Sequence, residues 1–225
     1  MKRLLGHICL GLGILALAGG MTKSFGQEVQ RFKIRSGIVE YKLSGVQTGS
    51  ETIYFDRWGM REAKYSQAET KMMNMSIKKN ILTLLDGDWT YSVDLDAKTG
   101  TKVPTPLLKD LSAQAKREGK DLTDIGEDIM KRCGAKKIGE ETFLGKRCEV
   151  WEIQNLKTKT WVWQGLALKT EASMMGKTIL IEATRVQENV NVSPEKLTLP
   201  KGVVITEGQN PMEMLKQMKT QMRKE

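Results

Sequence analysis

Strict alternation of apolar and polar residues marks one segment of the chain most clearly. From Asp88 to Asp96, every odd-numbered residue is apolar and every even-numbered residue is polar. A period of two predicts a β-strand with one buried face. The apolar run before it ends at Asp86-Gly87, a dipeptide suited to the positive φ angles of a tight hairpin. The two runs are therefore predicted to pair directly as antiparallel strands.

Similar strand-like runs, separated by turn glycines, continue along most of the chain. Gly59, Gly100, Gly145 and Gly165 are each flanked by residues that favour strands. This repetition predicts a mainly β (α+β) fold built on an antiparallel meander. The predicted strands lie at roughly 37–45, 50–57, 60–68, 70–77, 80–86, 88–95, 147–154, 158–164, 167–174 and 177–188.

The strand pattern stops after Pro104, and apolar residues take up helical spacing over about 106–133. Pro106 suits the first turn of a helix, and Gly119 separates the two helices that this range predicts. The residues 211–225 predict a third, short helix or tail, which is basic and rich in methionine. Two or three helices are therefore expected beside the sheet.

The first residues, 1–26, have the three parts of a secretory signal peptide. Two basic residues precede a short apolar run from Ile8 to Ala18, and small residues follow it up to Gly26. Cleavage after Gly26 would leave a single domain over 27–210 and the tail. No cysteine follows the apolar run at the position of a lipid anchor. We therefore expect a protein of the periplasm or the cell exterior that is not a lipoprotein.

Removal of this segment would change the chemistry open to the protein. His7 is the only histidine, so the mature chain would contain no imidazole. That excludes Ser-His-Asp and Cys-His catalysis and His-ligated metals. Loss of Lys2, Arg3 and Lys23 lowers the formal net charge from +9 to +6. This mild excess is compatible with transient contact with a membrane surface, and secretion argues against nucleic acid as a partner.

Two cysteines, Cys133 and Cys148, remain after cleavage. An exported protein tolerates disulfides, and a bridge here would close a loop of about 15 residues, worth on the order of 3 kcal/mol in the chain-entropy model. The spacing is not the C-x-x-C of a redox catalyst. We expect a structural disulfide between Cys133 and Cys148, with two buried free thiols as the alternative.

Four segments carry a resemblance to known proteins; they are Tyr54-Phe55-Asp56-Arg57-Trp58-Gly59, Leu85-Asp86-Gly87-Asp88-Trp89, Gly145-Lys146-Arg147-Cys148-Glu149-Val150-Trp151 and Lys159-Thr160-Trp161-Val162-Trp163-Gln164-Gly165. With these segments the chain resembles an uncharacterised family of secreted domains near the LolA/LolB-like superfamily of periplasmic lipoprotein carriers. The resemblance implies a strongly curved, incomplete barrel. It also implies that helices cover the concave face and enclose an apolar cavity for acyl chains.

Aromatic side chains on the predicted strands, with one methionine, are the candidate ligand contacts, because ligand cavities are lined mainly by apolar groups. They are Phe55, Trp89, Tyr91, Trp151, Trp161, Trp163 and Met174. The alternative is that these side chains form an ordinary core, as aromatic residues alternating along strands commonly do.

Two other groups of residues suggest chemistry more weakly. The methionines, including Met72-Met73-Asn74-Met75, could bind Cu(I) if three sulfurs converged. The acids Asp86, Asp88, Asp94 and Asp96 could bind Ca²⁺ or cleave glycosides, but aspartate is also common in turns for backbone reasons. No phosphate-binding loop or nucleophile elbow is present.

We therefore expect a non-enzymatic protein, without cofactor or metal, that binds a lipid, an acyl chain or a lipidated protein in an apolar cavity. The first alternative is a structural or protein-interaction module of the cell envelope with no ligand cavity. The second is a histidine-free hydrolase or metal protein, which would need acids or thioethers to converge in a cleft.

Overall fold

A computed structural model describes residues 29–72, 75–132, 134–174 and 177–208. The predicted signal peptide (1–26), the predicted tail (211–225) and Cys133 lie outside these ranges. Among the described residues, no helix is both long enough and apolar enough to cross a membrane.

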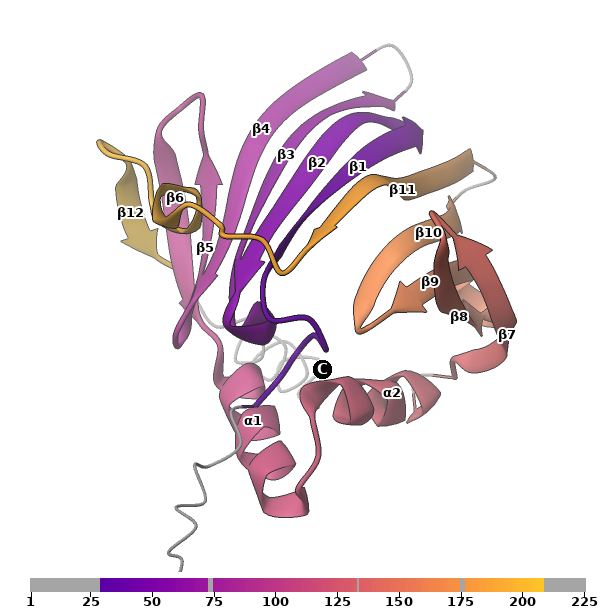
Figure 1. Cartoon of the computed structure of the whole chain (residues 1–225). Helices are drawn as coiled ribbons and strands as arrows, with labels where there is room; N and C mark the ends of the chain where they lie inside the picture. Colours follow the sequence, from indigo (N-terminus) through magenta and orange to yellow (C-terminus); the bar gives the residue numbers. More distant parts are fainter. Residues whose placement is uncertain (1–28, 73–74, 133, 175–176, 209–225) are drawn as a thin grey trace, which may run out of the picture.

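Twelve strands form a single sheet (Figure 1). Their bounds are β1 Gly37–Gly45, β2 Gln47–Asp56, β3 Arg61–Met72, β4 Met75–Asp86, β5 Trp89–Asp94, β6 Thr99–Pro104, β7 Lys136–Phe143, β8 Lys146–Ile153, β9 Thr158–Trp163, β10 Leu166–Met174, β11 Lys177–Glu188 and β12 Val204–Glu207.

The sheet is built from two consecutive meanders, β1 to β6 and β7 to β11, which join where β1 pairs with β11. The strand order is β12-β6-β5-β4-β3-β2-β1-β11-β10-β9-β8-β7. Neighbours are antiparallel except for β12, which lies parallel to β6. Figure 1 shows the sheet arching from β4 to β11 and then curling round at β10 to β7. The sheet is open, and the predicted curved, half-barrel fold is confirmed.

Three β-bulges accompany the curl of the second meander. The register shifts in the β1–β11, β10–β9 and β7–β8 pairs, and the extra residues are Thr184, Leu168 and Ile138. An extra residue in one strand bends that strand and increases its twist. Two of the extra residues, Leu168 and Ile138, lie in β10 and β7, which belong to the part of the sheet that curls round in Figure 1, and Thr184 lies in β11, where the two meanders join.

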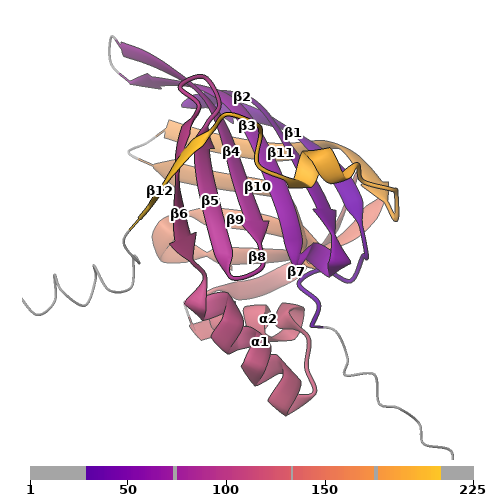
Figure 2. The ribbon, with the colours of Figure 1, turned by 90° about the vertical axis from the view of Figure 1, so that its left-hand side faces the viewer.

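Two helices lie at one end of the half-barrel, as Figures 1 and 2 show. They are α1, Pro106–Glu118, and α2, Leu122–Arg132, in the region where the sequence predicts them. Gly119 ends α1 in the left-handed region, with φ of 63°. Apolar side chains of both helices pack around Val29, which lies at the start of the described chain.

Both faces of the sheet are buried in places. One core cluster lies between the two arms of the curved sheet, where Phe55 of β2, Leu168 of β10 and Trp161 of β9 pack together with their neighbours. The second cluster covers the other face of β3 to β5. It is closed by the segment after β11, which contains the short 3-10 helix η3 (Pro194–Leu197) and crosses the sheet in Figure 2. Leu197 of η3 is fully buried there.

The strand predictions differ from the structure around β3 and β4 and at three further strands. β3 runs without a break to Met72 and β4 runs without a break from Met75, so the predicted boundaries near 68–70 and 77–80 are wrong. The strands β6, β7 and β12 were not predicted. The reason in β7 is that almost every residue is exposed, so no apolar alternation marks a buried face.

Candidate functional site

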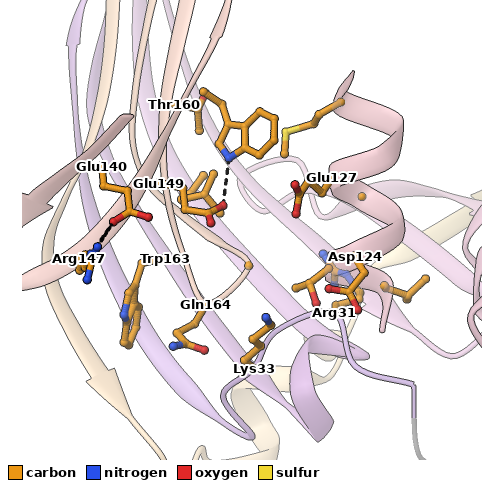
Figure 3. Close-up of a pocket in the computed structure, with 18 residues that line it drawn as sticks. Arg31, Lys33, Asp124, Glu127, Glu140, Arg147, Glu149, Thr160, Trp163 and Gln164 are labelled. Carbon is orange, nitrogen blue, oxygen red and sulfur yellow. Dashed lines mark hydrogen bonds and ion pairs between the residues drawn. The ribbon is translucent and has the colours of Figure 1, made fainter. Parts of the chain in front are cut away.

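A pocket of about 680 Å³ lies between α2 and the strands β7 to β10. The extended N-terminal segment forms one more side of it, with Arg31 and Lys33 (Figure 3). The pocket lies against one face of β8 and β9, whereas the other face of these strands packs into the core cluster between the arms. Strands β8 and β9 therefore separate the pocket from the core.

The N-terminal segment is held in place by two buried apolar side chains and by backbone hydrogen bonds. Phe32 and Ile34 are buried in the core cluster, so Lys33 between them points outward. The Phe32 N–H donates to the Trp58 carbonyl and the Lys33 N–H donates to the Gln164 carbonyl, each at 3.0 Å. These bonds tie the segment to the turn after β2 and to the turn between β9 and β10.

Apolar side chains form the floor of the pocket. Trp151 of β8 is only 3% exposed, and Met130 and Leu122 of α2 and Val162 of β9 lie on the same lining. The Trp151 indole N–H donates to Glu149 at 3.3 Å, so its single polar atom is satisfied. The Lys131 ammonium lies 6.0 Å from the centre of the Trp151 ring. The floor can therefore contact an apolar ligand without leaving a buried donor unpaired.

Charged side chains form the rim, and most of them are paired. Arg147 pairs with Glu140, and Lys137 pairs with Glu149 at 2.7 Å. The hydrogen bond from Lys137 holds the pKa of Glu149 below its usual value, and the hydrogen bond from Arg147 does the same for the pKa of Glu140. Both carboxylates are thus anionic at neutral pH. The site combines an apolar floor with a charged, mostly neutralised rim.

The predicted ligand contacts do not form one cavity. Trp151 and Trp163 line the pocket. Phe55 and Trp161 are instead packed in the core cluster between the arms, with exposures of 1% and 6%. The Trp161 indole N–H donates to Glu141 at 2.7 Å, which fixes that ring in the core.

The other predicted contacts lie elsewhere. Tyr91 packs against the second core cluster. Trp89 precedes it by two residues in β5 and therefore lies on the same face of the sheet. The Lys102 ammonium lies 4.2 Å from the centre of the Trp89 ring. Met174 ends β10, and its side chain lies outside the described part of the structure.

The structure does not show the expected disulfide. Cys148 is a free, fully buried cysteine in the described part of the chain, and Cys133 lies outside that part. Burial raises the pKa of the Cys148 thiol, which keeps it protonated and poorly nucleophilic.

The candidate carboxylates do not converge. Asp86 and Asp88 border a second cavity of about 370 Å³ beside α1, where Lys109 lies 3.4 Å from Asp88. Asp94 accepts the backbone N–H groups of Asp96 and Ala97 at 3.0 and 2.9 Å, so it serves the turn after β5. Within the described ranges, no group of three or more His, Cys, Asp or Glu side chains could hold a metal ion.

Several solved structures are distantly similar to this chain. No family model and no curated protein matches the chain. A solved structure described as an uncharacterized conserved protein from Thermus thermophilus has a TM-score of 0.49 and 8% identity, over 80% of this chain and 95% of that one. A putative outer membrane lipoprotein-sorting protein domain from Vibrio parahaemolyticus has a TM-score of 0.33 and 8% identity, over 75% of this chain and 92% of that one. PNGF-II has a TM-score of 0.38 and 13% identity, over 81% of this chain and 32% of its own. Likenesses this distant assign neither a family nor an activity.

Proposed function

We propose that this protein is a non-enzymatic binding protein for an amphipathic ligand, such as a lipid, an acyl chain or a lipidated segment of another protein. The observation that carries the proposal is the pocket between α2 and β7 to β10. Its volume of about 680 Å³ lies in the range of small-molecule sites, and it joins an apolar floor to a charged rim. A ligand with one apolar part and one polar part would satisfy both.

The proposed location is the cell envelope or the exterior, with transient contact with a membrane surface during ligand exchange. The signal-peptide pattern of residues 1–26 supports the location, and the +6 charge expected of the mature chain supports the contact. No step of covalent chemistry is proposed, because the rim carboxylates are already paired and the Cys148 thiol is buried.

The test compares two tryptophans that each have a lysine ammonium over the ring; Trp163 also packs against the core cluster between the arms, so the stability of each variant is measured as well. Trp163 lines the pocket and has the Lys146 ammonium 4.5 Å from its ring centre, whereas Trp89 lies away from the pocket with Lys102 at 4.2 Å. Binding of a fluorescent acyl probe should weaken in Trp163→Ala and stay unchanged in Trp89→Ala. Equal effects of the two substitutions would count against the site.

A second candidate function is an interaction module of the envelope. The packed cluster between the arms of the sheet favours it, because the interior that was expected to hold a ligand is filled by Phe55, Trp161 and Leu168. Native mass spectrometry and organic extraction of gently purified protein separate the two functions. Bound lipid supports the ligand-binding function, and consistent absence of any bound or added amphiphile supports the interaction module.

A further inference from the structure

The charges around the pocket leave one cation without a partner. Lys33 lines the pocket, and among the described residues its ammonium takes part in no hydrogen bond or ion pair. The other charged groups of the rim all have partners. These pairs are Arg31 with Glu62, Arg147 with Glu140, Glu149 with Lys137, Glu127 with Lys131, and Asp124 with the backbone N–H of Asp121.

The backbone at Lys33 is held by a hydrogen bond and by buried neighbouring side chains. Its N–H bonds to the Gln164 carbonyl at 3.0 Å, and its neighbours Phe32 and Ile34 are 7% and 5% exposed in the core. Figure 3 shows the side chains of Lys33 and Gln164 next to each other at one side of the pocket. The Gln164 amide also lines the pocket and could donate to the same ligand atom.

Resting on the function proposed above, we propose that the polar end of the ligand is an anion, a carboxylate or a phosphate, and that Lys33 binds it beside Gln164. The apolar part then extends over Val162 and Met130 toward Trp151. This orientation also keeps the anion away from Glu127 on α2, on the side of the pocket across from Lys33 (Figure 3). A reversed ligand would place its negative charge near that carboxylate.

The experiment uses amphiphiles with the same twelve-carbon chain and different heads. The probes are dodecanoate, dodecyl phosphate, dodecyl maltoside and dodecyltrimethylammonium, each titrated below its micelle concentration against the mature protein by calorimetry. Because Lys33 is exposed, its ion pair with a head group is worth about a two- to fivefold preference for the anions over the neutral maltoside. The two anionic arms distinguish a fatty-acid source from a phosphate source.

Lys33→Gln should abolish that preference, so that the anions and dodecyl maltoside bind with equal affinity. Lys201→Gln is the matched control, because Lys201 is also exposed and lies in the turn before β12, away from the pocket. Thermal melts of both variants should have the same midpoint as the parent protein, as expected for exposed sites.

The outcomes separate the two proposals. If none of the four amphiphiles binds, the proposed function itself is overturned. If all four bind equally, or if Lys33→Gln keeps the anion preference, the ligand-binding function stands and the role of Lys33 is overturned. Tightest binding of the ammonium amphiphile would overturn it as well and would assign the head group to the carboxylates Asp124 and Glu127.

Discussion

Replacement of Phe32 by alanine tests whether the N-terminal segment is part of the folded domain. Phe32 is 7% exposed, and its ring lies edge-on to Phe55 with the ring centres 5.0 Å apart. It also fills the space above Gly59, where an added Cβ would lie 2.4 Å from the ring. Truncation of a buried phenylalanine costs about 3–5 kcal/mol. That loss is a large share of the roughly 5–15 kcal/mol that stabilises a typical domain.

Urea unfolding followed by tryptophan fluorescence measures this loss. With a urea m-value of roughly 2 kcal/mol/M, the midpoint should fall by about 2 M. Leu156→Ala is the control, because Leu156 is 60% exposed and its truncation should change stability by less than about 0.5 kcal/mol. A loss below about 1 kcal/mol for Phe32→Ala would refute the packing of this segment. It would also remove the basis for placing Lys33 at the pocket.

Three further predictions concern the pocket and its surroundings. Gly165→Ala should lower stability by more than about 1 kcal/mol in the same unfolding assay, because φ is +84° and the added Cβ would lie 2.7 Å from the Arg31 carbonyl oxygen. Lys137→Met should raise the pKa of Glu149 in an NMR titration, because the hydrogen bond from Lys137 lowers it. In the parent protein, the stability that this carboxylate contributes is fully present above its unfolded pKa, near 4.5. That stability is lost as the pH falls through the lowered pKa of the folded state. Cys148 should react with a thiol reagent once the protein is unfolded without reductant, and a thiol seen only after reduction would contradict the free cysteine.

The alternation of apolar and polar residues predicts strands well where one face is buried. β1 and β11 have the bounds that the pattern predicts, and β5 differs by one residue at each end. β6 and β7 lack that signal, since their side chains are exposed or half-buried on both faces. Their position at the ends of the meanders, and not their composition, makes them strands.

The site is less predictable because aromatic residues carry the same signal in a core and in a pocket. Trp161 and Trp163 are two residues apart in β9 and both contribute to the core cluster, yet Trp163 also lines the pocket and Trp161 does not. Lys33 lies in a segment with a clear sequence pattern. The run Arg31-Phe32-Lys33-Ile34-Arg35 alternates basic and apolar residues, which indicates an extended segment with its basic side chains on one face.

The packing of the two arms of the sheet explains why we propose a ligand site beside α2 and not inside the half-barrel. Phe55 and Leu168 are each at most 1% exposed, so the space between the arms is filled by side chains. A ligand there would have to displace Phe32 and Ile34, which the backbone bonds of the N-terminal segment hold in place. On the other face of β8 and β9 the geometry differs. Among the described residues that line the pocket, α2 and the N-terminal segment face these strands, and the bulges in β10 and β7 accompany the curl of the second meander. Because the interior of the half-barrel is closed in this way, a ligand has to bind outside it, and the pocket of about 680 Å³ beside α2 is larger than the cavity of about 370 Å³ beside α1.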